Sequence, residues 1–255
     1  MVKMIVLDLD GTLLADDKNI SVHNLSVLEK CRREGIKIVI ATARSVRAAE
    51  RTIALVRPDV MILNGGALVI NDSGETVYKK LIPAGISDAI IEACLSNKNT
   101  GDITVETETN YYVSYRDPAD HPNYIYGEYY DFRKPLAQDS YKITVEIFKD
   151  RTAIEIESKF SGCGMIRYSG EYWYRFAHKE AEKMAAVTVI SELEKIAIDE
   201  IAAFGDDYND IEMIRKCGTG IAMENGIAEI KQAAKYVCGN NNEDGIGKWI
   251  EVNIL

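Results

Sequence analysis

Two carboxylates stand two residues apart directly after the first apolar run of the chain, residues 4–7. Asp8 and Asp10 are followed by Gly11, which has no side chain and lets the backbone close around an anion. A carboxylate can attack a phosphoryl group, but at ~4 Å and an effective dielectric of ~20 each pair of charges repels by ~4 kcal/mol. Mg²⁺ held by carboxylate oxygens would supply the counter-charge that this chemistry needs. The segment therefore predicts a site at which a carboxylate acts on a phosphoryl group.

Further polar residues lie next to the ends of other predicted strands and helices. The Thr42 hydroxyl could hold a phosphoryl oxygen, and the Lys183 ammonium could neutralise charge on the nucleophile. Asp206 and Asp210 offer a second acidic cluster for the metal. Because open α/β sheets bind ligands at the carboxyl ends of their strands, these side chains could form one site. The remaining candidates near strand ends are Ala43, Arg44, Asn64 and Asn209.

Each of these features also has an explanation that involves no chemistry. An Asp-x-Asp-Gly segment is often a turn or a calcium-like loop, and Asp206 and Asp210 could be acids that stabilise a helix N-terminus. Thr42 could be a strand-end hydroxyl, Asn64 a turn residue and Lys183 a solvated lysine. Polar residues at the ends of several strands of one sheet are hard to explain by stability alone, so the combination favours a catalytic site.

The elements that must position these residues follow an α/β pattern. Apolar runs alternate with helical patterns in the first third, where Ser21 and Ser45 can each cap a helix and Gly35 can end the first one. The final third repeats this order. We therefore predict a doubly wound, Rossmann-like parallel sheet formed by both ends of the chain. The predicted strands are 4–9, 36–42, 61–63, 201–204, 220–222 and 236–237, and the predicted helices are 22–34, 45–56, 180–195, 210–216, 228–234 and 246–250.

The middle of the chain differs in composition and pattern. Residues 71–74, Asn-Asp-Ser-Gly, are typical of a hairpin turn, and residues 83–178 are rich in Tyr, Thr and alternating strand patterns. We predict an α+β domain at 83–178, inserted after the third strand into a catalytic core of residues 1–82 and 179–255. Its predicted strands are 103–106, 111–115, 141–148, 165–169 and 172–176, and its predicted helices are 86–95 and 153–160.

Charge and cysteine content exclude several classes of protein. The net charge of -10 argues against binding to nucleic acid, which needs clustered Lys and Arg. The five cysteines form no CxxC pair, which fits a reduced cytoplasm. The N-terminal apolar stretch is too short for a signal peptide, and no segment approaches the length of a membrane span. We expect a cytoplasmic protein that binds neither nucleic acid nor membranes; its oligomeric state is not indicated.

The motifs resemble those of the haloacid dehalogenase-like (HAD) phosphatases, in particular the Cof-type subgroup with a type IIB cap. The first and last of the catalytic motifs are highly specific when they occur together, and the resemblance covers both ends of the chain. The inserted domain matches the cap only in length and α/β texture. The segments that carry the resemblance are 8–14, 41–44, 204–210, 222–226 and 242–245.

The resemblance implies a Mg²⁺-dependent phosphatase that works through an aspartyl-phosphate. Asp8 would be the nucleophile and a metal ligand. Asp10 would protonate the leaving oxygen, later activate water, and lend its backbone carbonyl to the metal. Asp206 would bind Mg²⁺, and Asp210 would support it directly or through water. The residues expected to bind phosphate or substrate are Leu9, Gly11, Thr42, Ala43, Arg44, Asn64, Lys183 and Asn209, and Thr42 and Lys183 are also expected to take part in catalysis.

Two positions depart from the family pattern. The third motif usually has glycine after its lysine, whereas Met184 follows Lys183, and Lys179 is a nearby rival. We choose Lys183 because its position 21 residues before Phe204 suits the family. Asp207 stands where glycine is common, and we expect it to face solvent.

Two other functions are alternatives to hydrolysis of a phosphomonoester such as a sugar phosphate. A phosphomutase of the same superfamily would transfer the phosphate instead of releasing it steadily. A non-catalytic phospho-accepting module would need neither Asp10 nor a large insert. In the leading interpretation the insert closes over the site and reads the leaving group. The insert side chains that could face the substrate are Tyr111, Arg116, His121, Tyr124 and Arg175.

Overall fold

Both ends of the chain build one sheet, as the alternating pattern predicts. The computed structural model describes residues 1–116 and 127–255, and in this part of the chain the sheet has eight strands in the order β14-β13-β12-β1-β2-β3-β4-β5. Neighbouring strands are parallel from β14 through β3, so the doubly wound α/β core is confirmed. These strands are β1 Met4–Leu7, β2 Lys37–Ala41, β3 Val60–Leu63, β12 Ile201–Gly205, β13 Thr219–Ala222 and β14 Tyr236–Val237.

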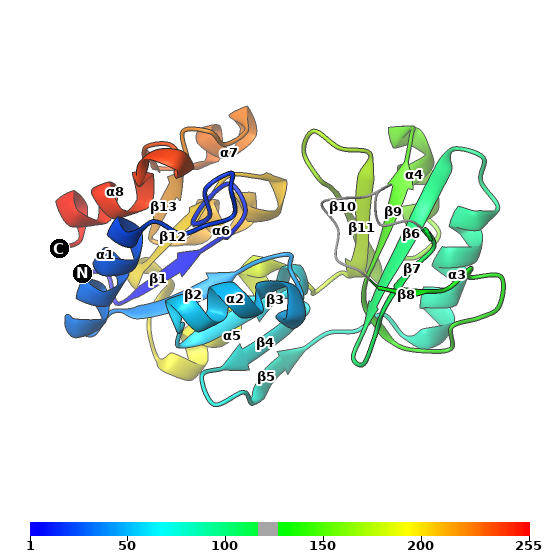
Figure 1. Cartoon of the computed structure of the whole chain (residues 1–255), viewed down its shortest axis with the longest axis horizontal. Helices are drawn as coiled ribbons and strands as arrows, with labels where there is room; N and C mark the ends of the chain where they lie inside the picture. The colour runs from blue at the N-terminus through cyan, green and yellow to red at the C-terminus, as the bar shows by residue number, and fades with distance from the viewer. Residues whose placement is uncertain (117–126) are drawn as a thin grey trace. The chain divides into compact units, whose positions relative to one another are not determined.

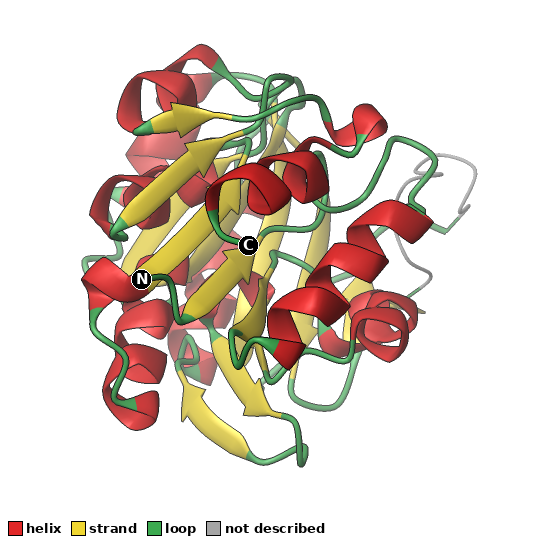
Figure 2. Ribbon diagram, turned by 90° about the vertical axis from the view of Figure 1, so that its left-hand side faces the viewer, coloured by secondary structure: helices red, strands yellow, loops and turns green. Residues whose placement is uncertain are grey.

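The central strands are continuous apolar runs because helices cover both faces of the sheet (Figure 2). Ser21 and Ser45 cap the first two helices as predicted, since their side chains accept hydrogen bonds from the backbone N–H groups of Asn24 and Ala48. No helix among the described residues is long and apolar enough to span a bilayer. The core helices are α1 Val22–Arg33, α2 Val46–Val56, α5 Lys183–Glu194, α6 Ile211–Lys216, α7 Ala228–Ala233 and α8 Gly245–Asn253.

The insert leaves the core after a fifth strand, not after the third as the sequence suggested. The hairpin of β4 Leu68–Asn71 and β5 Thr76–Lys79 extends the core sheet in the antiparallel sense, with the predicted turn at residues 71–74. The two compact units are Met1–Lys79 with Glu182–Leu255, and Lys80–Ala181 (Figure 1). The insert begins before residue 83 because Ile82 forms two backbone hydrogen bonds with Ser140 of the inserted sheet.

The inserted unit is a second, mixed sheet with helices on one face. Its described residues form six strands in the order β10-β11-β9-β6-β7-β8, and α3 Ala84–Leu95 and α4 Asp150–Glu157 pack against this sheet. An apolar core lies between the sheet and the helices. The strand β8, only two residues long, was not predicted. The strands are β6 Thr100–Thr107, β7 Tyr111–Val113, β8 Glu128–Tyr129, β9 Ser140–Ile147, β10 Cys163–Arg167 and β11 Trp173–His178.

The turn after β3 is packed against the start of α5. Gly66 has a φ of +104°, and a Cβ added there would overlap the backbone of Glu182. Lys183, the first residue of α5, directly follows this contact. The close approach permitted by Gly66 therefore fixes the N-terminus of the helix that carries Lys183.

We predict that Gly66→Ala destabilises the protein much more than Gly74→Ala. Gly74, in the β4–β5 turn, also has a positive φ, but nothing lies within 4 Å of an added Cβ. Backbone strain alone should lower the free energy of unfolding of Gly74→Ala by ~1 kcal/mol. Strain plus overlap should cost Gly66→Ala ~3 kcal/mol or more. Urea unfolding of both variants measures the difference, and equal losses would contradict the packing role of Gly66.

Candidate active site

Four polar residues stand at the carboxyl edge of four neighbouring parallel strands. Asp8 follows β1, Thr42 follows β2, Asn64 follows β3 and Asp206 follows β12, and these strands are adjacent in the order β12-β1-β2-β3. The chain winds away from β1 toward β2 on one side and returns through β12 on the other. Asp8 and Asp206 therefore lie at the point where the strand order reverses, which is where open α/β sheets bind ligands.

A buried lysine joins two carboxylates at this edge. Lys183 Nζ lies 2.6 Å from Asp8 Oδ1 and 2.6 Å from Asp210 Oδ1, and the lysine is only 2% exposed. Burial by itself would lower the pKa of Lys183, but the charges of Asp210 and Asp8 outweigh it and raise that pKa above its usual value. The ammonium is therefore held in its charged form.

Asp8 is electrostatically strained in the absence of further positive charge. Burial is the largest influence and raises its pKa well above the usual value. Lys183 acts in the opposite direction, whereas the neighbouring charges of Asp210 and Asp206 raise the pKa further. One ammonium thus serves three carboxylates, and an added cation would favour the ionised form of Asp8.

Asp206 is oriented by the loop that follows β1. Thr12 Oγ1 donates a 2.8 Å hydrogen bond to Asp206 Oδ1. Gly11 has a φ of +75°, and a Cβ on it would overlap the Asp206 carboxylate. Burial, followed by the charge of Asp210, raises the pKa of Asp206 to about 7. The hydrogen bond from Thr12 therefore orients this carboxylate, and the absence of a side chain at Gly11 leaves the space that it occupies.

Both carboxylate oxygens of Asp210 accept hydrogen bonds. Its Oδ1 accepts from Lys183, and its Oδ2 accepts from the backbone N–H groups of Asp206 and Asp207 at 3.2 and 3.3 Å. A Cβ on Gly205 would overlap this side chain. Asp210 therefore aligns Lys183 with the loop that follows β12.

The three carboxylates can hold a divalent metal ion. One ligand oxygen each from Asp8, Asp206 and Asp210 lies within 4.8 Å of the other two. Hard oxygen donors with excess negative charge suit cations such as Mg²⁺ or Ca²⁺ better than metals that prefer sulfur or nitrogen. The raised pKa values of Asp8 and Asp206 fit such a site, because a bound cation would offset the repulsion.

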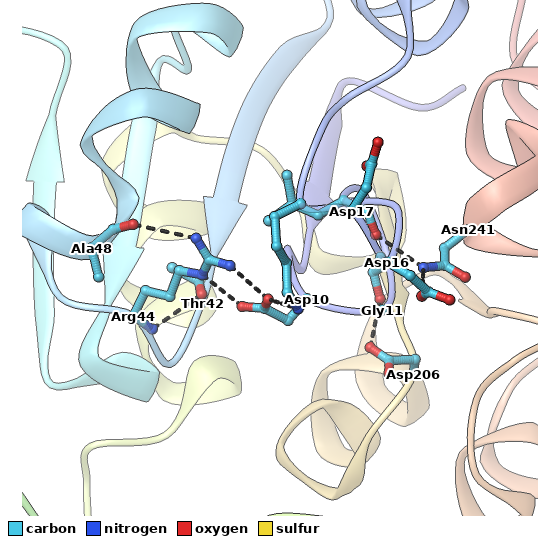
Figure 3. Close-up of polar contacts among 12 residues, drawn as sticks. Asp10, Gly11, Asp16, Asp17, Thr42, Arg44, Ala48, Asp206 and Asn241 are labelled. Carbon is cyan, nitrogen blue, oxygen red and sulfur yellow. Dashed lines mark hydrogen bonds and ion pairs between the residues drawn. The ribbon is translucent and has the colours of Figure 1, made fainter. Parts of the chain in front are cut away.

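The Asp10 side chain does not belong to this group of three. Arg44 Nε and Nη2 each lie 2.7 Å from the Asp10 carboxylate oxygens, and Lys18 Nζ lies 2.9 Å from Oδ1. Figure 3 shows Arg44 reaching Asp10 across the strand ends. Burial would raise the pKa of Asp10, but hydrogen bonds and charge from Arg44, then from Lys18, lower it. Asp10 is therefore held as an anion.

The loops after β2 and β3 are tied together by backbone hydrogen bonds. Asn64, with a φ of +51°, donates its N–H to Arg44 O at 2.9 Å, and Gly65 N–H donates to Thr42 O at 2.9 Å. Thr42 is buried, and its Oγ1 accepts from Arg44 N–H at 3.1 Å. Leu9 is also buried. Ala43 lies between Thr42 and Arg44 in the same loop.

The remaining candidates occupy different places. Asn209 lies in the 3₁₀ turn Tyr208–Asp210, and its Oδ1 is buried with no hydrogen-bond partner in the described part of the chain. Asp207 accepts from Tyr208 N–H and caps this turn. Lys179, the rival of Lys183, is part of the inserted unit.

Of the insert residues suggested by the sequence, His121 and Tyr124 lie outside the described residues. Burial raises the pKa of Tyr111 above its usual value. Arg116 lies over the ring of Tyr129, 4.7 Å from its centroid, and Arg175 is buried.

Sequence reasoning assigned no role to three residues that the structure brings to the site. Thr12 contacts Asp206, Lys18 contacts Asp10, and Asn225 Nδ2 donates to Gly11 O at 2.7 Å. Thr12 belongs to the first motif and Asn225 to the C-terminal pattern, so their positions carried a signal. Nothing in the sequence pointed to Lys18.

Comparison with known proteins agrees with this arrangement. A family model of haloacid dehalogenase-like hydrolases matches residues 5–250. YxeH of Bacillus subtilis is 29% identical to the chain over 273 residues, with 100% of the chain and 99% of YxeH covered. YitU of the same organism, a 5-amino-6-(5-phospho-D-ribitylamino)uracil phosphatase, is 27% identical, with 97% of the chain and 96% of YitU covered. A solved HAD subclass IIB sugar phosphatase has a TM-score of 0.87 at 24% identity, with 98% of both chains covered.

The α/β core with acidic residues at its strand ends and the inserted α+β cap are features of one class of hydrolases. The chain belongs to the haloacid dehalogenase-like hydrolases. The resemblance of its motifs to this family is thereby confirmed, and its inserted cap has the fold of the subclass IIB sugar phosphatase.

We predict that Asp206→Asn stabilises the metal-free protein at pH 8 and removes its stabilisation by Mg²⁺. With a pKa of about 7, folded Asp206 keeps a proton that the unfolded chain releases near pH ~4. The stability of the native metal-free protein therefore falls as the pH rises through this interval. The amide has no charge and can still accept from Thr12, so the midpoint temperature of unfolding should rise by ~3 °C at pH 8.

Thermal unfolding at pH 5 and pH 8, with chelator and with Mg²⁺, measures both effects. The gain should be smaller at pH 5, where native Asp206 is protonated. A variant that keeps the full Mg²⁺-induced shift would contradict a role for Asp206 in metal binding.

Proposed function

We propose that this HAD phosphatase requires Mg²⁺ and hydrolyses a small phosphorylated metabolite through an aspartyl-phosphate on Asp8. The contact that carries the proposal is the 2.6 Å ion pair between Asp8 and the buried Lys183. One ligand oxygen of Asp8 also lies within 4.8 Å of ligand oxygens of Asp206 and Asp210. A buried carboxylate with a fixed ammonium on one oxygen, beside a cation site, suits nucleophilic attack on phosphorus.

Asp8 attacks through the oxygen that Lys183 does not hold. Lys183 contacts Oδ1, which leaves Oδ2 to form the bond to phosphorus while the bond to the leaving oxygen breaks. Bound Mg²⁺ would be held by Asp8, Asp206, the Asp10 carbonyl and, directly or through water, Asp210, and would neutralise charge on the phosphoryl group. Because both oxygens of Asp210 already accept hydrogen bonds, we favour its acting through water.

Asp10 is the acid and then the base. In the resting protein Arg44 and Lys18 keep it ionised, which is the state that accepts a proton from water in the second step. The first step needs a protonated Asp10. A phosphate group that attracts Arg44 and Lys18 away from Asp10 would permit protonation, because their charge holds its pKa low.

The phosphoryl oxygens are bound by the loops around Asp8. Thr42, directly after β2, offers its hydroxyl, and Lys183, the first residue of α5, offers its ammonium. Arg44 offers its guanidinium once it leaves Asp10. Leu9, Gly11 and Ala43 contribute backbone N–H groups, and Asn64 and Asn209 offer amides at the margin of the site.

The substrate is a phosphomonoester of a sugar or polyol. YitU acts on a ribityl phosphate, and the subclass IIB neighbour acts on sugar phosphates. The cap then selects the leaving group, since the core addresses only groups common to all such esters. No observation favours a phosphomutase or a phospho-accepting module.

The cap sheet offers a polar face for that selection. Tyr111, Glu106 and Lys142 lie directly opposite one another on β7, β6 and β9, on the face that does not bear the apolar core. Arg175 lies on β11, opposite Thr144, two residues along from Lys142. Burial lowers the pKa of Lys142 to about 8, Glu106 opposes this shift and Arg175 adds to it. Such a charged row can recognise hydroxyl or anionic groups.

We predict that Asp8→Asn abolishes turnover while the fold survives. The amide keeps the shape of the side chain but is a poor nucleophile and metal ligand, so the rate should fall by ~1000-fold or more. A screen of phosphorylated sugars and polyols for steady release of inorganic phosphate tests the native protein. The aspartyl-phosphate should be detectable as an added phosphoryl mass in the native protein and absent from the variant.

Metal dependence is measured in the same assay. Chelation should remove activity, Mg²⁺ should restore it and Ca²⁺ should not, because its larger and looser coordination misaligns nucleophile and phosphorus. Asp8→Asn that keeps a tenth of native activity, or equal rates with Ca²⁺, would contradict the mechanism. Transfer to a second hydroxyl without release of phosphate would indicate a mutase.

We predict that Lys142→Met changes which phosphate ester is preferred but does not change the catalytic activity of the core. Ratios of kcat/KM among phosphorylated metabolites should shift by ~10-fold, because one charged contact to the leaving group is lost. Hydrolysis of p-nitrophenyl phosphate should stay within ~3-fold, since it needs only the core. Lys98→Met, at an exposed lysine of the same unit, is the control. An unchanged ranking would exclude Lys142 from recognition.

A further inference from the structure

The loop that carries Asp10 is held from outside by asparagines of the C-terminal third. This loop, residues 10–19, follows β1 and contributes both Asp10 and Lys18. Asn225 Nδ2 donates to Gly11 O at 2.7 Å, and Asn241 Nδ2 donates to Leu14 O at 3.0 Å. Two carbonyls of the loop are therefore bound by side chains more than 200 residues away.

Asp16 is the main attachment point on the loop. Its carboxylate accepts from Asn241 Nδ2 at 3.2 Å and from Asn242 Nδ2 at 3.0 Å, and its N–H donates to Asn242 Oδ1 at 3.0 Å. Figure 3 shows Asn241 meeting Asp16 on the side of the loop away from Arg44. Donors and acceptors match in each of these bonds.

The same asparagines are linked to the metal-binding side of the site. Asn225 Oδ1 accepts from Asn241 N–H at 3.0 Å, so the two residues act together. Two residues after Asn225, Ile227 N–H donates to Asp206 O at 2.9 Å. One short segment after β13 therefore holds the backbone beside Asp10 and the backbone of Asp206 at a fixed separation.

We propose that Asn225, Asn241 and Asn242 form a clamp that positions Asp10 for proton transfer to the leaving group. The proposal rests on the phosphatase mechanism above. The Asp10 side chain is 43% exposed, so packing alone does not fix it. Of its two ionic partners, Lys18 belongs to the same loop, and Arg44 has to leave Asp10 before Asp10 can be protonated. A displacement of ~1 Å at a catalytic group can cost ~100-fold in rate. These asparagines are positioning residues, since they reach the chemistry only through the loop.

Removing one amide tests the clamp. Asn225→Ala loses the bonds to Gly11 O and Asn241 N–H, and Asn253→Ala is the control, because Asn253 Nδ2 donates only within the last helix, to Trp249 O. With a sugar or polyol phosphate that the native enzyme hydrolyses, kcat/KM of Asn225→Ala should fall by ~30-fold, because this leaving group needs a proton. With p-nitrophenyl phosphate, whose leaving group departs unprotonated, the fall should be ~3-fold or less.

A charge swap supplies the rescue. Asn242→Asp places two carboxylates together, and Asp16→Asn places two amide donors together, so each single change should weaken the clamp. Asp16→Asn with Asn242→Asp lets the new amide donate to the new carboxylate and restores every donor and acceptor. The double variant should recover kcat/KM on the poor leaving group to within ~3-fold of native, which is the coupling that a double-mutant cycle measures.

Amide hydrogen exchange gives a readout without turnover. Residues 11–16 should exchange faster in the single variants than in the native protein and the swap variant. If Asn225→Ala loses activity equally on both esters, or if the swap recovers nothing, the positioning role is overturned. A native protein that releases phosphate from no ester would instead overturn the proposed function, and unchanged exchange in every variant would overturn the clamp itself.

Discussion

A lysine ammonium between two buried carboxylates is the interaction on which the site depends. Lys183, Asp8 and Asp210 are all almost fully excluded from water, so each charge relies on its partners for the stabilisation that water would give. Removing one partner from such a group typically leaves an uncompensated charge that costs ~3–5 kcal/mol. The arrangement therefore fixes the start of α5 and the ends of β1 and β12 relative to one another.

Negative charge exceeds positive charge in this group. Three carboxylates share one ammonium, and the raised pKa values of Asp8 and Asp206 express the remaining repulsion. This repulsion lowers the stability of the metal-free protein, and a bound cation would relieve it. The Asp10–Arg44 pair lies apart from it and carries its own counter-charge. The two groups of charged side chains are thus electrostatically separate.

Close backbone approaches make this geometry possible. Gly66 admits the start of α5, Gly11 admits the Asp206 carboxylate and Gly205 admits Asp210. The insert leaves after the β4–β5 hairpin and returns at α5, so it interrupts none of the parallel strands. The inserted unit can therefore vary without a change in the core sheet.

The sequence by itself determined the local structure and the identity of the strand-end residues. Continuous apolar runs predicted the parallel strands, Ser21 and Ser45 predicted two helix starts, and residues 71–74 predicted the hairpin turn. These predictions were possible because each signal depends on neighbours within a few residues. The motif residues Asp8 and Asp206 were found for the same reason, since each directly follows such a run.

Only the tertiary structure decided which side chains meet. Lys183 contacts Asp8 across 175 residues, Thr12 contacts Asp206 across 194, and Asn241 contacts Leu14 across 227. Such partners depend on how the strands are ordered and packed, which no local pattern encodes. The departure of the insert after β5, and the short strand β8, were missed for a related reason: edge and two-residue strands are defined by their pairing with a neighbour and carry almost no periodicity of their own.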